Sequence, residues 1–408
     1  MIASPFKALR PKKEYAQRVV APPYDVVSTE EASQLYQDNN DSFISVSRPE
    51  VTITGNNDPY SEAVYKRGKE NLDLLIDKEL LEREDKPCYY AYQINTSNHI
   101  QTGLSLVGSV EAYLGNRIKK HELTRPEKEN DRINNIDFLN AQTGPVLGVY
   151  RDDPAIHTII HKVVKEEVPI LSAKGPNKSQ HSIWKIDNHE LIKTITNQFE
   201  KHEAIYIADG HHRSAAAANV CSQRSASQTD THNYFLMTIF PESEMLIHDY
   251  NRVVHDDKAI NKKDLFSYLN KHFKISIADN TYKPNEPYDY GMYFDKQWFR
   301  LTYKDKTNKI SDPVESLDVS LLQNKILNAY FQILDPRLDP RISFIGGVRG
   351  LQGIEDAVDK TPNSVGFSLF ATSMSQLMAV ADANQLMPPK STWFEPKLLD
   401  GLLSHVLD

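Results

Sequence analysis

The segment Ile205–Val220, IYIADGHHRSAAAANV, carries the side chains best suited to chemistry. An apolar run that stops at Asp209 predicts a buried strand, and the alanine-rich stretch after Gly210 predicts a helix. A helix start attracts phosphate and carboxylate groups, and an arginine strengthens that attraction through paired hydrogen bonds. We therefore expect an anion-binding corner formed by Asp209, Gly210, His211, His212 and Arg213.

A structural explanation of the same residues exists. Asp209 would then be a helix cap, Arg213 a surface ion pair, and one histidine a packing residue. Two histidines and an arginine are not preferred helix starters, however, and their crowding into one turn favours a ligand site.

A second candidate site begins at His121 and Glu122. A glutamate beside a histidine and cations suits a base that takes a proton from a hydroxyl group, and nearby cations would hold a polyphosphate. The alternative is a solvated charged loop, because most runs of charge are solvated. The residues of interest are His121, Glu122, Thr124, Arg125, Lys128, Asp131 and Arg132.

The C-terminal segment Met387–Lys397 is the third candidate. Lysines and hydroxyl groups in a proline-stiffened loop suit phosphate binding, and the neighbouring aromatic rings suit a base or an apolar group. The segment lacks the glycines of a P-loop, so a terminal loop fixed by its aromatic residues is an equal alternative. The residues in question are Lys390, Ser391, Thr392 and Lys397.

The composition restricts the class of protein. The net charge is −8 and no block of Lys or Arg occurs, which argues against sequence-independent binding of nucleic acid. Cys88 and Cys221 form no CxxC pattern, so a disulfide framework or a zinc ribbon is not expected. No signal peptide or membrane span is recognisable. We expect a cytoplasmic globular protein with no membrane partner, and the oligomeric state stays open.

The pattern of apolar residues predicts a mixed α/β protein in three segments: 1–115, 116–255 with the DGHHR loop, and 256–408. A capping box at Ser28–Glu31 predicts a helix start. Further predicted strands are Gly103–Leu114, Val146–Tyr150, Ile183–Ile186 and Ala204–Ala208. Further predicted helices are Asp131–Gln142, His189–His202 and Leu317–Leu334, and Ile118–Asp131 is predicted to be a polar loop.

Six motifs run in order along the chain: KALRP at Lys7–Pro11, PPYDV at Pro22–Val26, SRPE at Ser47–Glu50, HELTRPEKENDR at His121–Arg132, IADGHHR at Ile207–Arg213 and PPKSTWFEPKL at Pro388–Leu398. Together these motifs resemble a known bacterial family, domain of unknown function 1015. The DGHHR segment also resembles the D-G-x-H-R signature of the ParB/sulfiredoxin-like superfamily, in which a strand, turn and helix cradle nucleotide phosphates. The resemblance implies a ParB/sulfiredoxin-like core with N- and C-terminal α/β additions.

Through the DGHHR region the chain is similar to free-serine kinases, which make O-phosphoserine from ATP or ADP. The resemblance implies phosphoryl transfer with Mg²⁺, or the reverse reaction, which would act as a phosphoserine phosphatase in serine biosynthesis. Glu122 would be the base, with Glu30 or Glu31 as substitutes, and the residues between Glu122 and Asp209 would contain an insertion.

The implied roles are specific. Glu122, Asp209 and His212 would be catalytic, and Asp209 would also contact the metal. Nucleotide or phosphate would bind Gly210, His211, Arg213, Lys390, Ser391 and Thr392. Substrate would bind His121, Thr124, Arg132 and Lys397.

Two other functions remain open. Asp209, His211, His212, His121 and Glu122 supply ligand types for Mn²⁺, Fe²⁺ or Zn²⁺, which would suit a metal-dependent phosphoester hydrolase. The superfamily signature also allows a ParB-like, nucleotide-switched DNA-binding protein, although the acidic net charge and the lack of a recognisable helix-turn-helix argue against it.

Overall fold

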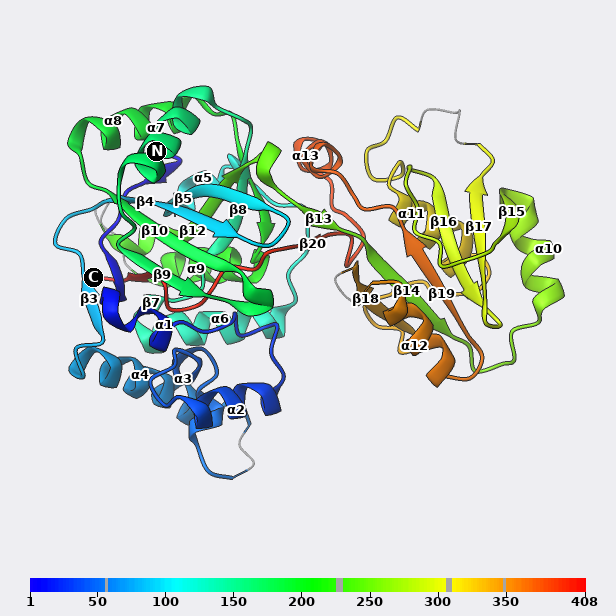
Figure 1. Ribbon diagram of the computed structural model, residues 1–408, viewed down its shortest axis with the longest axis horizontal. Coiled ribbons are helices and arrows are strands. Elements are labelled where there is room, and N and C mark those ends of the chain that lie inside the picture. The colour runs from blue at the N-terminus through cyan, green and yellow to red at the C-terminus, as the bar shows by residue number, and fades with distance from the viewer. Residues whose placement is uncertain (56–57, 225–229, 306–309, 348–349) are drawn as a thin grey trace. The chain divides into compact units, whose positions relative to one another are not determined.

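The computed structural model describes residues 1–55, 58–224, 230–305, 310–347 and 350–408 (Figure 1). These residues form two compact units. Unit 1 comprises Met1–Met245 and Pro396–Asp408, and unit 2 comprises Leu246–Glu395. The chain thus leaves unit 1 after Met245 and returns to it at Pro396.

A mixed sheet of nine strands forms the centre of unit 1. Its strands are β1 (Ala3–Ser4), β4 (Tyr89–Asn95), β5 (Ile100–Ser109), β6 (Ile118–Lys119), β8 (Val146–Tyr150), β9 (Leu171–Lys174), β10 (Gln180–Ile186), β11 (Ile205–Asp209) and β12 (Tyr234–Pro241). They run in the order β6-β11-β8-β12-β5-β4-β10-β9, and β1 pairs with β5. Two pairs of neighbours are parallel, β6 with β11 and β8 with β12.

Helices cover both sides of this sheet. Figure 1 shows α7 (Pro154–Glu166) and α8 (His189–Lys201) on one side, and α4 (Glu62–Asp77) and α6 (Pro126–Leu139) on the other. Apolar strand residues such as Ile207 and Leu104 pack into one core with helical residues such as Ile156 and Phe199. The remaining helices of unit 1 are α1 (Ala16–Val19), α2 (Thr29–Asp38), α3 (Ile44–Ser47), α5 (Val110–Leu114) and α9 (His211–Gln223).

A second sheet of unit 1 joins distant parts of the chain. Its strands are β2 (Ala8–Pro11), β3 (Leu81–Arg83), β7 (Ala141–Gln142) and β21 (Ser404–Val406), in the order β3-β2-β21-β7. Ahead of β21, Ala21 and Asp400 exchange backbone hydrogen bonds of 3.1 and 3.0 Å. The last segment of the chain is therefore built into unit 1.

Unit 2 contains an antiparallel sheet of six strands in the order β15-β17-β16-β19-β14-β18. A two-stranded ribbon pairs β13 (Ile247–His248) with β20 (Trp393–Phe394). The strands of the sheet are β14 (Tyr250–His255), β15 (Phe273–Ala278), β16 (Asp289–Phe294), β17 (Gln297–Tyr303), β18 (Ile342–Gly346) and β19 (Ser364–Leu369). The helices are α10 (Lys262–His272), α11 (Asp318–Leu322), α12 (Gln352–Lys360) and α13 (Met374–Asp382).

The mixed α/β class is confirmed, and so is the strand, turn and helix around Gly210. The capping box at Ser28 is also present, with Ser28 bonded to the backbone of Glu31 and Glu31 bonded to the backbone of Ser28. The three predicted segments differ from the two compact units, because their first boundary falls between β5 and β6 of one sheet. Pairing between strands that are distant in sequence is not visible in local patterns.

Three predicted elements are wrong in part. The strand predicted to reach Leu114 ends at Ser109, whose side chain caps the short helix α5. Helix α6 begins at Pro126 inside the predicted loop, because a proline at the first helical position loses no helical hydrogen bond. The long helix predicted from Leu317 is α11 followed by a π-helical segment at Gln323–Asn328.

Within the described residues, no helix has both the length and the apolar character that a bilayer crossing requires.

Candidate functional site

The DGHHR corner meets the HELTR loop because β6 and β11 are parallel neighbours. Parallel strands end at the same edge of a sheet, so residues 121–125 leave the sheet beside residues 210–213. A direct contact joins the two loops: the backbone N–H of Arg125 donates to Nε2 of His212 at 3.0 Å. The strand pairing therefore assembles one site from motifs that are far apart in sequence.

The turn before α9 is held by Asp209. Gly210 has a φ of 91°, and its N–H donates to Oδ1 of Asp209 at 2.8 Å. The ammonium of Lys397 donates to Oδ2 at 2.8 Å. Burial opposes ionisation of this carboxyl, but Lys397 and Arg213 lower its pKa below the ordinary value. Helix α9 then starts at His211 with no side-chain cap.

We expect Gly210→Ala to lower the free energy of unfolding of unit 1 by about 2 kcal/mol, because a left-handed backbone strains any residue with a Cβ. The new Cβ would also lie 3.3 Å from Cα of Val146. Urea unfolding, followed by the fluorescence of Trp184 in a Trp298→Phe, Trp393→Phe background, measures the loss. Gly55→Ala controls for the contact with Val146, because Gly55 also has a positive φ, of 106°, but nothing within 4 Å of the added Cβ, so it should show only the loss due to backbone strain. Equal stability of wild type and Gly210→Ala would contradict the expected strain.

His121 and His211 are buried and His212 is half-buried, and the pKa of each of the three is lowered. Burial lowers the pKa of His121 to about 4. Burial, and then the neighbouring His121, lower the pKa of His211 well below its ordinary value. Burial, and then Arg125, lower the pKa of His212. The rings of His121 and His211 pack edge to face with centroids 4.5 Å apart.

His211 faces the carboxylate of Glu122. Its Nε2 accepts a long hydrogen bond of 3.4 Å from the backbone N–H of His121. In the neutral ring the proton must then be on Nδ1, which lies 3.9 Å from Oε2 of Glu122. The Glu122 side chain is 44% exposed, so it combines an oriented carboxylate with access from solvent.

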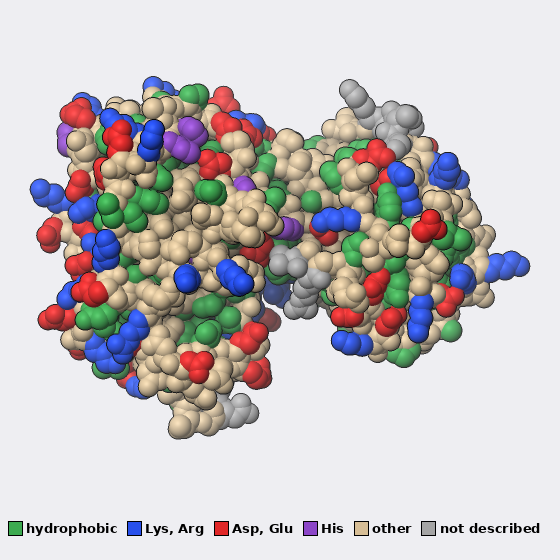
Figure 2. Space-filling view, in the orientation of Figure 1, with side chains coloured by type: hydrophobic (Ala, Val, Ile, Leu, Met, Phe, Trp, Pro, Cys, Tyr) green, Lys and Arg blue, Asp and Glu red, His purple; other side chains and the backbone are tan. Residues whose placement is uncertain are grey.

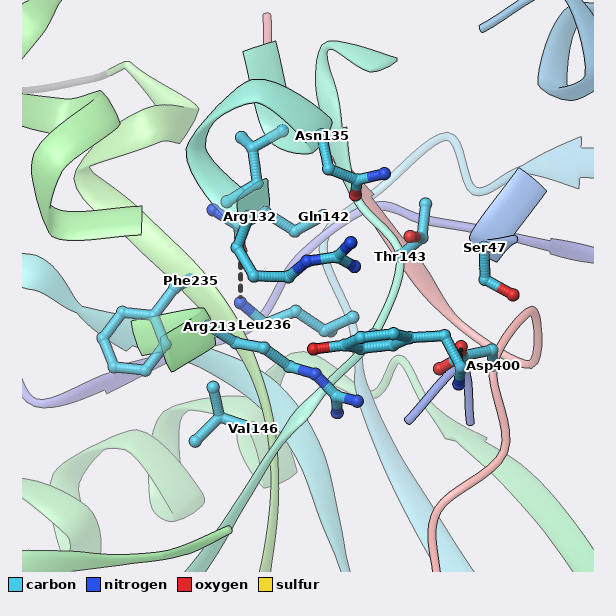
Figure 3. A pocket seen from close by; sticks show the side chains of 13 residues that line it. Ser47, Arg132, Asn135, Gln142, Thr143, Val146, Arg213, Phe235, Leu236 and Asp400 are labelled. Carbon is cyan, nitrogen blue, oxygen red and sulfur yellow. Dashed lines mark hydrogen bonds between the residues drawn. The ribbon is translucent and has the colours of Figure 1, made fainter. Parts of the chain in front are cut away.

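A cavity containing two arginines lies beside the start of α9 (Figure 3). Arg132 and Arg213 each lie over the ring of Tyr24, with 4.0 and 5.1 Å from guanidinium carbon to ring centroid. Arg213 donates to the carbonyl of Pro145 at 2.7 Å, and Arg132 donates twice to Oδ2 of Asp131, at 3.1 and 2.7 Å. Each guanidinium also has a carboxylate neighbour, because Arg132 is paired with Asp131 and Arg213 lies 3.7 Å from Oδ1 of Asp25.

Asp400 supplies a buried carboxylate to the same cavity, where Figure 3 shows it pointing toward the two arginines. Its Oδ2 accepts the backbone N–H of Tyr24 at 3.2 Å, and Oδ1 has no hydrogen-bond partner among the described residues. Burial raises the pKa of Asp400 to about 6, against the opposing effect of Arg213.

We expect the free energy of unfolding of the Asp400→Asn variant, measured relative to the wild type, to rise by about 3 kcal/mol between pH 4 and pH 7. The pKa of Asp400 is raised in the folded state, so the carboxyl makes its full favourable contribution to the stability of the wild type only below the unfolded-state pKa of about 4. That contribution is lost as the pH passes 6. Urea unfolding across this range measures the difference, with the exposed Asp187→Asn as control for loss of one charge. A difference that does not vary with pH would contradict the assignment.

A comparison with models of protein families shows the family to which the chain belongs. The model of the family described as "Protein of unknown function (DUF1015)" matches residues 3–320. The chain belongs to this family. A comparison with curated proteins gave no match.

Solved structures with a distant likeness to this DUF1015 protein include SbnI with a C-terminal truncation from Staphylococcus aureus. That match has 12% identity and a TM-score of 0.39, and it covers 72% of this chain and 85% of the other. A variant of a free serine kinase in complex with ADP matches with 11% identity and a TM-score of 0.37, covering 76% and 95%. A conserved hypothetical protein from Pyrococcus furiosus matches with 12% identity and a TM-score of 0.34, covering 73% and 94%.

In this DUF1015 protein most of the predicted site residues lie together in unit 1. Thr124 donates to Oε2 of Glu129 at 2.7 Å, on the loop that carries Glu122. Glu31 is used by the capping box of α2. The residues brought to one edge of the sheet are His121, Glu122, Thr124, Arg132, Asp209, Gly210, His211, His212, Arg213 and Lys397.

The predicted phosphate ligands Lys390, Ser391 and Thr392 belong to unit 2. The carbonyl of Lys390 accepts a hydrogen bond from Arg252 at 2.9 Å, and Oγ of Ser391 donates to the carbonyl of Pro388 at 2.6 Å. These contacts fix the loop within unit 2. A role of this loop in phosphate binding stays a prediction.

Sequence reasoning missed Asp400, and it left Tyr24 open between the rim of a pocket and a turn, with the turn preferred. A signal for Asp400 is present, because a single carboxylate stands in the apolar run LLDGLL at Leu398–Leu403. Carboxylates are rarely fully buried without a functional or structural partner.

The residues present do not fit direct coordination of Mg²⁺ by Asp209. Both of its oxygens accept hydrogen bonds, and the ammonium of Lys397 lies 2.8 Å from Oδ2, where it would repel a divalent cation. The positive charge next to this carboxylate comes from a lysine. Asp209 therefore serves in this structure as the anchor of the turn.

Proposed function

We propose that the protein transfers a phosphoryl group between a nucleotide, ATP or ADP, and the hydroxyl group of free serine. The observation that carries the proposal is the parallel pairing of β6 with β11. It brings the carboxylate of Glu122 within 3.9 Å of His211, at a helix start that also carries Arg213. A base beside a group of anion-binding donors is the arrangement that phosphoryl transfer requires.

In this proposal the start of α9 binds the transferring phosphate. The uncapped helix start after Gly210 attracts anions, and Arg213 adds a guanidinium in the first turn. Neutral histidines suit this role, because His211 and His212 can donate or accept hydrogen bonds without titrating near neutral pH. Their neighbours fix the rings, so little reorganisation is needed when substrate binds.

The cavity would hold the head group of serine. Arg132 suits an α-carboxylate, and Oδ1 of Asp400, which has no hydrogen-bond partner among the described residues, suits an α-ammonium group. A zwitterion would satisfy both kinds of charge at once. This match of charges is the reason for proposing an amino acid and not a simple alcohol.

The reaction balances with the side chains of the site and the two substrates. The serine oxygen forms a bond to phosphorus while the bond between the terminal phosphorus and the nucleotide oxygen breaks. The hydroxyl proton passes to Glu122 and then to solvent. The reverse direction returns the phosphoryl group to ADP and would consume phosphoserine. Mg²⁺, when bound to the nucleotide, would neutralise phosphate charge.

The test incubates the purified full-length protein with serine, Mg²⁺ and either ATP or ADP, and measures O-phosphoserine by mass spectrometry. The reverse assay starts from O-phosphoserine and ADP. We expect product in at least one direction, and none when serine is replaced by ethanolamine, which lacks the carboxylate. No transfer in either direction would overturn the proposal.

The same assay separates the hydrolase alternative. Release of phosphate from O-phosphoserine without any nucleotide would indicate a hydrolase instead. The structure offers little support for a metal at this site. Among the described residues, the one group of three His, Cys, Asp or Glu ligands close enough to share a metal ion is His157, His161 and Glu244, elsewhere in unit 1.

A further inference from the structure

Two exposed histidines on α7 lie one helical turn apart. The apolar residues Ile156, Ile160 and Val163 face the core, and His157 and His161 each follow a buried isoleucine in sequence. This spacing places both rings on one side of the helix. The rings stack with centroids 3.9 Å apart, and Figure 2 shows histidine side chains at the surface over α7.

A carboxylate is anchored next to these rings. Glu244 ends the 3₁₀ turn Glu242–Glu244 after β12, and its Oε2 accepts the backbone N–H of Thr102 at 2.5 Å. The backbone carbonyl of Glu244 is bonded to Nε2 of His99 at 2.7 Å. These contacts leave Oε1 of Glu244 3.6 Å from Nε2 of His161.

The turn itself is fastened to the start of α7. Oδ1 of Asp152 accepts hydrogen bonds from the backbone N–H and the hydroxyl group of Ser243, at 3.2 and 3.0 Å. Asp152 lies two residues after the end of β8, so the carboxylate and the two imidazoles are held by connected parts of unit 1. The cluster lies after the C-terminal end of β8, whereas the arginine cavity is lined by Val146 at its N-terminal end.

We propose that His157, His161 and Glu244 bind a divalent transition-metal ion such as Zn²⁺. Their ligand atoms all lie within 4.8 Å of one another. Ligands of a tetrahedral zinc ion are about 3.3 Å apart, for bonds of about 2.0 Å. The pair His161–Glu244 is already close to that distance, and small rotations of the exposed imidazole rings bring in the third ligand.

The donor set selects the kind of metal. Two imidazole nitrogens and one carboxylate oxygen suit Zn²⁺, Ni²⁺ or Cu²⁺, whereas Mg²⁺ and Ca²⁺ prefer oxygen ligands alone. Water would complete the fourth position. The hydrogen bond from Thr102 orients the carboxylate in the way that outer partners orient metal ligands. The ion would join α7 to the turn after β12.

The test titrates Zn²⁺ alone into chelator-stripped, full-length protein, in competition with a chromophoric chelator. We expect one ion per chain with micromolar affinity, and a rise in melting temperature on addition of Zn²⁺. His157→Ala, His161→Ala and Glu244→Gln should each weaken binding at least 10-fold and abolish the thermal shift. Mg²⁺ at the same concentration should produce neither effect.

His189→Ala is the matched control, because His189 is an exposed histidine that lies 3.4 Å from a carboxylate, that of Glu190 on α8. It should bind Zn²⁺ like the wild type. Equal affinity in the wild type and the His161→Ala variant, or loss of affinity only in His189→Ala, would overturn the site. The measurement needs no enzymatic activity, so its outcome is independent of the proposed phosphoryl transfer.

Discussion

Glu122→Gln is expected to lower the rate of phosphoryl transfer to serine by about 10²–10⁴-fold while nucleotide affinity stays unchanged. Glutamine has the size of glutamate but cannot accept the hydroxyl proton. The side chain is partly exposed and lies 3.9 Å from His211, so its exchange should leave the fold intact. The rate of O-phosphoserine formation under saturating substrates measures the effect, and calorimetry measures nucleotide binding.

Glu127→Gln is the matched control, because Glu127 is an exposed glutamate in the first turn of α6 on the same segment. It should keep the wild-type rate. A Glu122→Gln variant that transfers phosphate at the wild-type rate would remove Glu122 from the mechanism. Glu30, which the family resemblance gives as a substitute for Glu122 as the base, would then be the next residue to mutate.

Arg213→Ala is expected to weaken nucleotide binding by about 10–100-fold, the cost of losing a charged hydrogen-bond donor. Arg213 is in the first turn of α9 and lies over the ring of Tyr24, 5.1 Å from its centroid. Arg213→Lys should recover only part of the affinity, because an ammonium cannot form paired hydrogen bonds to a phosphate. Calorimetry with ATP and with ADP measures both variants.

Arg224→Ala controls for the loss of a positive charge near α9, since Arg224 is paired with Asp137 at the other end of the helix. Its nucleotide affinity should match the wild type. Arg213 also donates to the carbonyl of Pro145, so the fold of Arg213→Ala is checked by circular dichroism. Wild-type affinity in a folded Arg213→Ala variant would show that the arginine does not hold nucleotide.

The sequence alone determined the local geometry of the DGHHR corner. The apolar run up to Asp209, the glycine and the alanines that follow are neighbours in the chain, and strand, turn and helix depend mainly on such neighbours. The same holds for the capping box at Ser28. It also holds for the mixed α/β class, which follows from the alternation of such segments along the chain.

Only the tertiary structure decided which of these pieces meet. The pairing of β6 with β11 brings Glu122 to His211, and the return of the chain after unit 2 brings Lys397 and Asp400 to the same unit. These contacts join residues far apart in sequence, and their free energy depends on burial and register across the whole sheet. A local sequence pattern contains no information on a free energy that depends on the whole sheet. The partners of Asp209 and the arginine cavity can therefore be seen only in the folded chain.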